Sequence, residues 1–596
     1  MSESVLEVDG LSVSFERPDG VVEAVNAVSL TISKGECLGI AGESGAGKSQ
    51  ALLAPFRLGP AAARVSGSVK LQGAELLGMS APEMEDVRGK RVGFVLREAA
   101  LTPHLTVEAH LLEMVRRHLP VRGVEAERHA LEWMERARIP DAKRRLRQYP
   151  SDLSADTRLR VTIAMALLCE PALLIADDPT AALNGIAQAQ ILDLIDEVHR
   201  DMEMAVAFIS RDLRVIARVA DRVALMRAGR IVESGDVEEA FRRPRTDDLA
   251  ALLRATPRLD GPTANSLPEP GGGAPVLYVD DVRVQFPVRR AGRARRLAAV
   301  DGVTFALKPG ETLGVVGESG AGKSVLARTI AQLLPRDAGA VSFLGRDLLP
   351  STREALRRTR RDMQIVLSAS SVGLDPHARL GVSIGEPLRG FEPHLGDAER
   401  EQRIGAAMAL TGLDPSLAAC YPHELDAGRR QRASIARAMI LNPRLLVCDD
   451  ALSALDVGVQ AQIAALLVEL QRQSGVSMLF ASRDLALARE ISHSLLILYL
   501  GRGVEYGPTQ TVLNRPRHPY TKALLTAALT LDPAAARARP RIRTVEDAPD
   551  PLDTHAGLRF LKSRVKGDHS SAQYRPRWLE PAPGHFVAEH DAAEIA

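Results

Sequence analysis

Cysteine, long apolar runs and an excess of charge of either sign are all scarce in this chain. Its 596 residues include four scattered cysteines and no C-x-x-C pair, which excludes a disulfide framework and fits a reducing compartment. No apolar run approaches about 18 residues, so we expect no membrane-spanning segment, and the N-terminal MSESVLEVDG shows no signal-peptide pattern. The net charge of +1 gives no bulk field that would attract nucleic acid or acidic lipid.

The chain does contain a duplicated octapeptide. GESGAGKS occurs at Gly42–Ser49 and again at Gly317–Ser324, 275 residues later, each time after a short apolar run and before an apolar helical pattern. A phosphate-binding P-loop requires this strand–loop–helix context, because backbone N–H groups and the helix N-terminus cradle the phosphates. The lysines would reach the β/γ-phosphates and the final serines can ligate Mg²⁺. The predicted nucleotide-binding residues are Gly42, Ser44, Gly45, Gly47, Lys48 and Ser49, and Gly317, Ser319, Gly320, Gly322, Lys323 and Ser324.

Three further motif pairs recur at a constant offset of 272 residues: YPSDL/YPHEL, LLIADDP/LLVCDDA and FISRDL/FASRDL, which begin at Tyr149, Leu173 and Phe208 in the first half. A constant offset predicts two duplicated domains, which we place at 1–255 and 276–530. Residues 256–275 are rich in Pro and Gly and are expected to form a flexible linker. Residues 531–596 are rich in Ala, Arg and Pro and are expected to form an irregular tail.

The order of sequence patterns is the same in the two predicted domains. β-Rich sequence precedes the P-loop, a charged helical stretch follows it, and two apolar strand candidates then lead into polar residues. This order predicts an α/β nucleotide-binding domain with a parallel core sheet. Asp177 and Asp449 end apolar strand candidates. A carboxylate in that position beside a P-loop suits Mg²⁺, directly or through water, although a structural role for a strand-end aspartate stays open.

Together these motifs resemble the ATP-binding cassette (ABC) ATPases, and most closely the peptide/nickel importer branch in forms with two fused nucleotide-binding domains. The sequence segments typical of this branch are QAQILDLI (Gln188–Ile195), SALDVGVQAQI (Ser453–Ile463) and HPYTKALL (His518–Leu525). The resemblance implies tandem P-loop NTPase domains, each with a parallel core sheet, an antiparallel β subdomain and a helical subdomain. It also implies a pseudo-dimer within one chain that holds two ATP molecules with Mg²⁺, each between one P-loop and the opposite domain's signature sequence. Asp177 and Asp449 then match the Walker B aspartates.

The same resemblance implies partners and a location. ATPases of this branch energise two transmembrane permease subunits and, indirectly, serve an extracytoplasmic solute-binding protein. A cytoplasmic protein, peripheral on the inner face of the cell membrane through the permease, is therefore expected. Tandem cassettes that act on ribosomes or DNA carry a long charged linker or zinc-binding cysteines, whereas residues 256–275 are nearly uncharged, so no nucleic-acid partner is expected. The transported solute is not readable from these domains.

Several residues match positions that contact nucleotide in the family. Phe15 and Phe286 match an aromatic residue that stacks on adenine, although two core phenylalanines on strands would give the same pattern. The signature, normally LSGGQ, reads LSADT and LDAGR here, so Ser154 is kept and Asp426 replaces the serine that would hydrogen-bond the γ-phosphate. A carboxylate in this position repels the triphosphate, and Arg429 could offset part of that repulsion.

The chain departs from the family at the residues that cleave ATP. Asp178 and Asp450 stand where a glutamate polarises the attacking water. Because a shift of about 1 Å in a positioning group can cost about 10²-fold in rate, slow turnover is expected. Arg211 and Arg483 replace the switch histidine, and a guanidinium can still contact a phosphate as an arginine finger does.

Two linking segments are also altered. The Q-loop glutamine is replaced by Arg97 or Val95 in the first half, depending on a gap, and by Ser368 in the second. The D-loop residue is Asn184 in the first half and Asp456 in the second.

The tail lacks the cysteine-rich motif that many relatives carry and that is read as an iron–sulfur or structural site. Leu558, Val565 and Glu589 stand where cysteines would. Leucine and valine supply no ligand, so no iron–sulfur cluster is expected.

Intact P-loops beside substituted catalytic positions leave two functions open. One is the energising subunit of an importer for peptides or related solutes, with impaired hydrolysis. The other is a silenced, ATP-binding regulator or scaffold of the same fold. If turnover persists, the better site should combine Lys323, Ser324, Asp449, Asp450 and Arg483 with Ser154 of the opposite domain.

Overall fold

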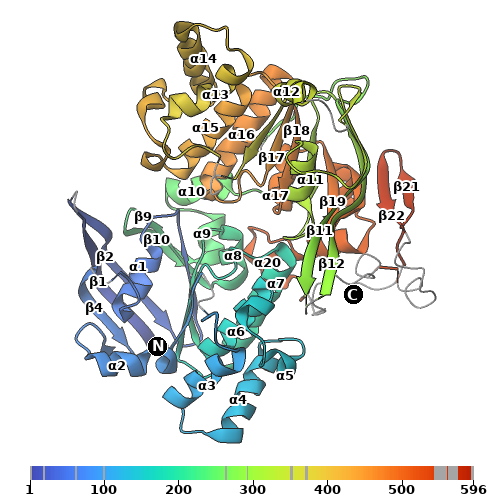
Figure 1. Ribbon diagram of the computed structural model, residues 1–596. Coiled ribbons are helices and arrows are strands. Elements are labelled where there is room, and N and C mark those ends of the chain that lie inside the picture. Colours follow the sequence, from blue (N-terminus) through green and yellow to red (C-terminus); the bar gives the residue numbers. More distant parts are fainter. Residues whose placement is uncertain are drawn as a thin grey trace. The chain divides into compact units, whose positions relative to one another are not determined.

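A computed structural model describes residues 3–17, 20–60, 63–97, 101–261, 263, 265–290, 293–348, 353–368, 373–541, 560–561 and 575–591. The chain forms two compact units. Unit 1 contains Met1–Thr256 together with Thr526–Asp547, and unit 2 contains Pro257–Leu525 together with Ala548–Ala596. Near its end the chain therefore leaves unit 2, contributes a segment to unit 1 and returns; the colours of Figure 1 follow this path.

The core of unit 1 is a six-stranded sheet made of β3 (Cys37–Ala41), β6 (Val92–Val95), β7 (Leu173–Asp177), β8 (Ala205–Ile209), β9 (Arg222–Arg227) and β10 (Arg230–Asp236). The order is β10-β9-β3-β8-β7-β6, and all neighbours are parallel except β9 and β10. Strands β3 and β8 are buried at every residue, because both faces of the sheet are covered. Their continuous apolar runs are typical of a parallel sheet.

An antiparallel sheet covers one face of this core. It contains β1 (Ser4–Arg17), β2 (Gly20–Ser33), β4 (Ala63–Leu71) and β5 (Ala74–Glu75) in the order β2-β1-β4-β5. Helix α1 (Lys48–Leu53), the short turn η1 (Ala54–Phe56), α2 (Ala81–Asp86) and η2 (Val87–Arg91) pack with it. The side chains that fill the space between the two sheets include Leu6, Leu52, Phe56, Leu71 and Ile175.

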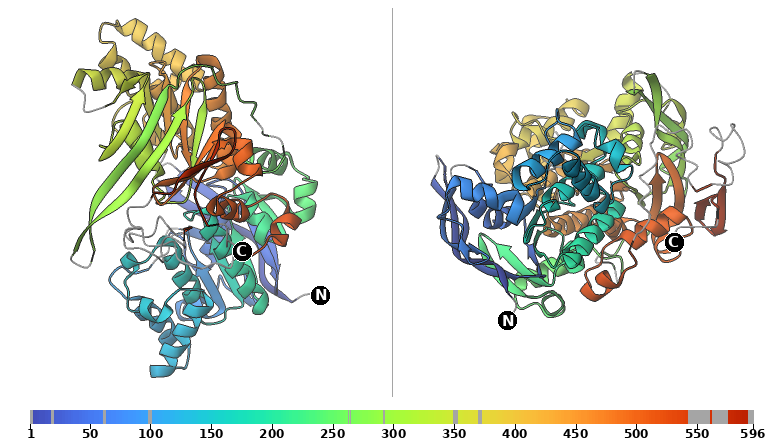
Figure 2. Two further views of the ribbon diagram at one scale, coloured as in Figure 1. Left: turned by 90° about the vertical axis from the view of Figure 1, so that its right-hand side faces the viewer. Right: turned by 90° about the horizontal axis from the view of Figure 1, so that it is seen from below.

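Helices cover the other face of the parallel sheet in unit 1. They are α3 (Val107–His118), α4 (Gly123–Arg136), α5 (Ala142–Arg145), η3 (Pro150–Asp152), α6 (Ala155–Leu167), α7 (Gly185–Asp201), α8 (Leu213–Val219), α9 (Val237–Arg242) and α10 (Asp247–Ala255). Helical spacing of apolar residues places Leu111 and Val115 of α3 on one buried face, and Ala130 and Trp133 of α4 on another. Figures 1 and 2 show α3–α5 and the antiparallel sheet at separate edges of unit 1.

Unit 2 repeats both sheets. Its antiparallel sheet contains β11 (Leu277–Arg290), β12 (Arg293–Leu307), β14 (Ala338–Phe343) and β15 (Arg346–Asp347), in the order β12-β11-β14-β15. Its core sheet contains β13 (Thr312–Val316), β16 (Met363–Leu367), β17 (Leu445–Asp449), β18 (Ser477–Ser482), β19 (Ser494–Tyr499) and β20 (Arg502–Pro508). The order β16-β17-β18-β13-β19-β20 matches the order in unit 1 strand for strand.

The helices of unit 2 also follow those of unit 1. They are α11 (Lys323–Ile330), α12 (Arg353–Asp362), α13 (Leu380–Phe391), α14 (Asp397–Leu410), η4 (Pro415–Ala419), η5 (Pro422–Glu424), α15 (Ala427–Met439), α16 (Val457–Ser474), α17 (Leu485–Ile491), α18 (Thr509–Asn514) and α19 (Pro519–Ala527). Helices α13–α15 bury a cluster of their own, whereas α16 and α17 pack on the core sheet. The predicted fold class, tandem α/β P-loop domains with parallel core sheets, antiparallel β subdomains and helical subdomains, is confirmed.

The expectation of an irregular tail is corrected by three elements. Helix α20 (Pro533–Ala538) packs on α8 and α9 of unit 1. Strands β21 (Trp578–Ala582) and β22 (His585–Ala588) form a hairpin that extends the core sheet of unit 2 beside β20. The hairpin is fixed by His585, whose Nε2 lies 2.7 Å from Oε1 of the buried Glu505. Composition alone did not reveal these tertiary partners.

The linker, whose flexibility stays a prediction, makes several hydrogen bonds with residues of unit 2. Arg489 of α17 donates from Nη1 to the carbonyl oxygen of Arg258 at 2.9 Å, and Nε2 of His493 lies 2.7 Å from the carbonyl oxygen of Pro268. Further along, the backbone N of Gly271 donates to the carbonyl oxygen of Pro309. The described part of the linker therefore lies along unit 2.

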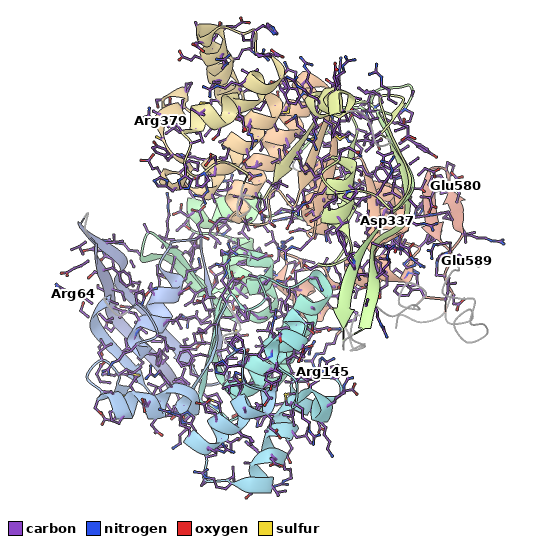
Figure 3. The ribbon with its side chains drawn as sticks, viewed as in Figure 1. Arg64, Arg145, Asp337, Arg379, Glu580 and Glu589 are labelled. Carbon is purple, nitrogen blue, oxygen red and sulfur yellow. The ribbon has the colours of Figure 1, made fainter. Side chains whose placement is uncertain are left out.

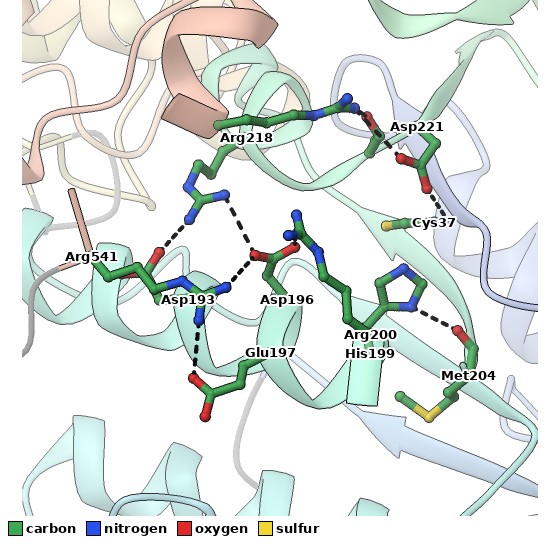
Figure 4. Close-up of polar contacts among 12 residues, drawn as sticks. Cys37, Asp193, Asp196, Glu197, His199, Arg200, Met204, Arg218, Asp221 and Arg541 are labelled. Carbon is green, nitrogen blue, oxygen red and sulfur yellow. Dashed lines mark hydrogen bonds and ion pairs between the residues drawn. The ribbon is translucent and has the colours of Figure 1, made fainter. Parts of the chain in front are cut away.

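A charged network holds the C-terminal arm, residues 529–541, on unit 1. Arg541 pairs with Asp196 and Glu197 of α7, at 3.4 Å each. The neighbouring Arg218 of α8 pairs with Asp193 and Asp196, and all three side chains are buried (Figure 4). The arm thus follows α19 of unit 2 in the sequence and packs on α7–α9 of unit 1. In the same way, the linker follows α10 of unit 1 and contacts α16 and α17 of unit 2.

In the described part of the chain, no helix has both the length and the apolar character needed to cross a membrane.

Candidate nucleotide-binding sites

Both P-loops have the geometry that the octapeptide predicts. In each unit the loop follows a buried parallel strand, β3 or β13, and α1 or α11 begins at the lysine. Gly47 and Gly322 precede these lysines with φ values of 95° and 98°. A Cβ atom on either glycine would lie 2.2 Å from a backbone carbonyl oxygen, that of Ala24 or Ala299. Only glycine fits here, because L side chains rarely adopt this conformation and the space is closed.

The two lysines are held in the same way. Nζ of Lys48 donates to the carbonyl oxygens of Gly42 (2.8 Å) and Glu43 (2.6 Å), and Nζ of Lys323 donates to those of Gly317 and Glu318 at 2.7 Å each. Each ammonium group is thus placed over its own loop, where phosphates would lie. Burial lowers the pKa of Lys323 to about 8, with the charge of Asp450 acting in the opposite direction.

The residues predicted to serve Mg²⁺ differ between the units. In unit 1, Oγ of Ser49 donates to Oδ1 of Asp177 at 2.9 Å, so hydroxyl and carboxylate lie side by side as a shared cation requires. Burial raises the pKa of Asp177, and its hydrogen bond from Ser49 opposes this. In unit 2, Arg328 takes the place next to Asp449.

In unit 2, Nε of Arg328 donates to Oδ2 of Asp449 at 2.9 Å. The other oxygen, Oδ1, is buried and has no hydrogen-bond partner. Within the described residues no hydrogen bond joins Ser324 to Asp449. An orphaned, buried carboxylate oxygen beside a P-loop fits a Mg²⁺ ion or one of its waters. The donor sets of both units are therefore compatible with the ion.

The substituted acid and the substituted switch residue contact each other in both units. Oδ2 of Asp178 lies 3.1 Å from Nε of Arg211, and Oδ2 of Asp450 lies 3.9 Å from Nε of Arg483. The loops are aligned by backbone bonds, since the N–H of Asp178 donates to the carbonyl oxygen of Ile209 at the end of β8. A carboxylate oxygen engaged by a guanidinium must be released before it can accept a proton from water.

Comparison with known proteins decides the family. The family model described as "ABC transporter" matches residues 25–181 and 300–453. The chain belongs to the ABC transporter family. A second model, "Oligopeptide/dipeptide transporter, C-terminal region", matches residues 504–564 of this ABC protein.

Curated relatives match this ABC protein over nearly its whole length. The glutathione import ATP-binding protein GsiA of Pectobacterium atrosepticum is 38% identical over 626 residues, covering 99% of this chain and 97% of the relative. GsiA of Salmonella choleraesuis is 40% identical over 581 residues, covering 92% of this chain and 93% of the relative. A solved dimeric ATP-binding cassette in a post-hydrolysis state with ADP and Pi is 25% identical, covers 39% of this chain and 98% of that one, and has a TM-score of 0.36.

The signature residues of this ABC protein cap helices. Oγ of Ser154 accepts from the N–H of Thr157 at the start of α6, and Oδ1 of Asp426 accepts from the N–H of Arg429 at the start of α15, at 3.2 and 2.7 Å. Both residue types are good N-caps. The pairing of Asp426 with Arg429 also runs through the side chains, with Nε 3.4 Å from Oδ2. A serine or an aspartate just before a helical pattern could have signalled both caps.

One ion pair within the first signature was missed. Asp156, which replaces a glycine of the usual signature, accepts from Nε of Arg160 at 3.1 Å. Arg160 is fully buried and also donates to Oε1 of Gln190 at 3.1 Å. An acid and an arginine four residues apart on a helix could have signalled this pair. The substitution thus has a structural partner in its own domain.

Four further predicted residues lie on strands or directly after one: Phe15, Phe286, Val95 and Arg97. Phe15 on β1 and Phe286 on β11 are partly buried at the edge of their cores, where the adenine role stays a prediction. Val95 is buried in β6, whereas Arg97 follows that strand and its charge acts on Asp177. Which of the two stands at the Q-loop position stays open, and metal binding by Asp177 stays a prediction.

In the tail, Leu558 and Val565 lie outside the described residues. Glu589 follows β22 (Figure 3). Its backbone N donates to the carbonyl oxygen of Arg577 at 2.7 Å.

Proposed function

We propose that this chain is the ATP-binding, energising subunit of an importer for peptides or related solutes such as glutathione. The observation that carries the proposal is the pair of intact P-loops, each with a buried lysine fixed over its loop, in a chain that matches glutathione import ATP-binding proteins over nearly its whole length. The match to the oligopeptide/dipeptide transporter C-terminal region supports the same class of solute.

ATP phosphates would draw Lys48 and Lys323 away from the loop carbonyls that now hold them. Mg²⁺ would lie near Ser49 and Asp177 in unit 1, and near Asp449 in unit 2, where it would neutralise phosphate charge. Phe15 and Phe286 are proposed to stack on adenine, and Ser154 and Asp426 to approach the γ-phosphate bound by the opposite P-loop. Two transmembrane permease subunits and an extracytoplasmic solute-binding protein complete the importer at the inner face of the membrane.

Hydrolysis in this protein is proposed to be weakened. The support is the contact between Asp178 and Arg211, repeated by Asp450 and Arg483. Each aspartate is one methylene shorter than the usual glutamate and already has a guanidinium partner, so it is poorly placed to polarise a water. The alternative function, a silenced regulator or scaffold that binds ATP without turnover, rests on the same contacts.

The two functions are separated by measuring ATP affinity and ATP turnover on one purified protein, with and without its permease. The double variant Lys48→Ala/Lys323→Ala is the negative control, or blank. The double variant Asp178→Asn/Asp450→Asn tests whether the two aspartates contribute to turnover. Turnover above the blank that falls in the asparagine variant supports the importer subunit. Lys-dependent binding with turnover at the blank level, even with permease, supports the regulator. A nucleotide affinity that is unchanged when both lysines are replaced would contradict both proposals.

A further inference from the structure

The strand-end aspartates of the two units have different partners. Asp177 accepts a hydrogen bond from the P-loop serine, Ser49. Asp449 instead accepts one from the guanidinium of Arg328 at 2.9 Å, and its side chain is only 2% exposed while that of Arg328 is 45% exposed. The two P-loops are otherwise alike in sequence and in the hold on their lysines, so this is a local difference between two nearly equivalent sites.

A single residue accounts for the difference. Arg328 lies on α11, four residues after Ser324, and therefore on the same face of the helix. The equivalent residue in unit 1, at the 275-residue offset of the P-loops, is Leu53 at the end of α1. Leu53 is buried in the apolar core of unit 1 and cannot pair with a carboxylate. Among the described residues, Arg97 acts on Asp177 through its charge at the first site, whereas the second site has a guanidinium hydrogen-bonded to its strand-end aspartate.

This cation changes the electrostatics that a metal ion would meet. The guanidinium offsets the negative charge of Asp449 and occupies one of its oxygens. A divalent cation approaching the free oxygen Oδ1 meets a neutralised pair rather than a bare carboxylate, and it also meets repulsion from Arg328. The triphosphate, in contrast, gains a positive charge near its own site.

We propose that Arg328 sets the Mg²⁺ requirement of the second nucleotide site. As the resident counter-ion of Asp449, it does part of what the metal does at the first P-loop, so nucleotide binding in unit 2 depends less on Mg²⁺ than binding in unit 1. The inference rests on the proposed binding of Mg²⁺-ATP at these P-loops. Arg328 acts through Asp449 and is a positioning residue rather than a catalytic one.

The experiment isolates each site and measures the Kd of a fluorescent ATP analogue with Mg²⁺ and with EDTA. Lys48→Ala leaves the second P-loop, and Lys323→Ala leaves the first. The expected result is a smaller Mg²⁺/EDTA affinity ratio for the second site. In the Lys48→Ala background, Arg328→Leu should raise that ratio by about tenfold, the scale of outer-shell effects on metal affinity, while Arg328→Lys should keep it low.

The reciprocal variant and a direct metal measurement complete the test. Leu53→Arg in the Lys323→Ala background should lower the ratio at the first site. The affinity for Mn²⁺ in the presence of nucleotide, measured by electron paramagnetic resonance, should increase in Arg328→Leu. Far-UV circular dichroism checks that each variant is folded. A ratio that stays within twofold in Arg328→Leu, or falls because Arg328 orients Asp449 toward the metal, overturns the inference. Loss of nucleotide binding in both single-lysine backgrounds would refute the proposed function itself.

Discussion

Raising the pH above 8 should deprotonate Lys323 in the second P-loop. We expect this to increase the stability of the nucleotide-free protein and to weaken its affinity for nucleotide. The ammonium group is buried against its loop and donates to two backbone carbonyls. Burial lowers its pKa from 10.5 to about 8. Bound phosphates would keep Lys323 protonated, because their negative charge beside the buried ammonium group raises its pKa. The affinity for nucleotide and the stability of the free protein must therefore both change with pH.

The sign and size follow from these pKa values. Between about pH 8 and 10.5 the unfolded chain keeps a proton on Lys323 that the folded chain has released, so the unfolding free energy rises with pH, by up to about 3 kcal/mol. Below pH 8 both states are protonated and the cost of burying the charge is present in full. Nucleotide affinity moves the other way, because binding must restore the proton, and it falls by up to about tenfold per pH unit above 8.

The assay uses Lys48→Ala, which leaves only the second P-loop. Titration with a fluorescent ATP analogue from pH 7 to 9.5 should show constant affinity up to about pH 8 and then a fall. Urea unfolding gives the unfolding free energies of the nucleotide-free wild type and of Lys323→Met. The effects of other titrating groups cancel in the difference between the two proteins. As the pH rises, the wild type should become more stable relative to Lys323→Met. A flat profile in either measurement refutes the assignment to Lys323.

Three further predictions concern stability, each measured by urea unfolding. Arg218→Ala leaves the buried Asp193 without its partner and should cost unit 1 about 3 kcal/mol, whereas Arg541→Ala, whose pairs are more exposed, should cost below about 1 kcal/mol; equal costs would contradict the burial argument. Asp426→Ala should cost unit 2 about 1 kcal/mol through the lost cap, and Asp426→Ser should restore it; a serine variant as weak as the alanine one would argue against capping. Phe208→Ala, in the centre of the parallel sheet, should cost about 3–5 kcal/mol, and a loss under about 1 kcal/mol would show that the core can refill the space.

The fold and the P-loops could be predicted because their signals are local and repeated. A glycine that must adopt φ near 95°, a lysine that begins a helix and an apolar strand before the loop all lie within one short segment, and the whole pattern occurs twice. Asp178 and Arg211 are predicted separately through the resemblance to the family, and each follows an apolar strand.

What the sequence could not predict are contacts between residues far apart in the chain. Arg328 and Asp449 are separated by 121 residues, and nothing in their local patterns pairs them. The contacts of the linker could not be predicted either, because its partners on unit 2 bind backbone carbonyls, such as that of Arg258, which composition does not reveal. The tail was misjudged for a similar reason, since α20 is short and is held by a surface of unit 1.

The placement of the linker and the C-terminal arm has a consequence for how the gene for such a protein can be divided. Unit 1 takes its last helix, α20, from beyond residue 525, and Leu531 and Ala536 of that arm are buried on it. A break between residues 256 and 257 would give a first polypeptide with an uncovered apolar surface and a second that carries the missing cover. Fusion into one chain therefore guarantees more than equal amounts of two nucleotide-binding units: it supplies unit 1 with a segment that lies beyond residue 525 in the sequence.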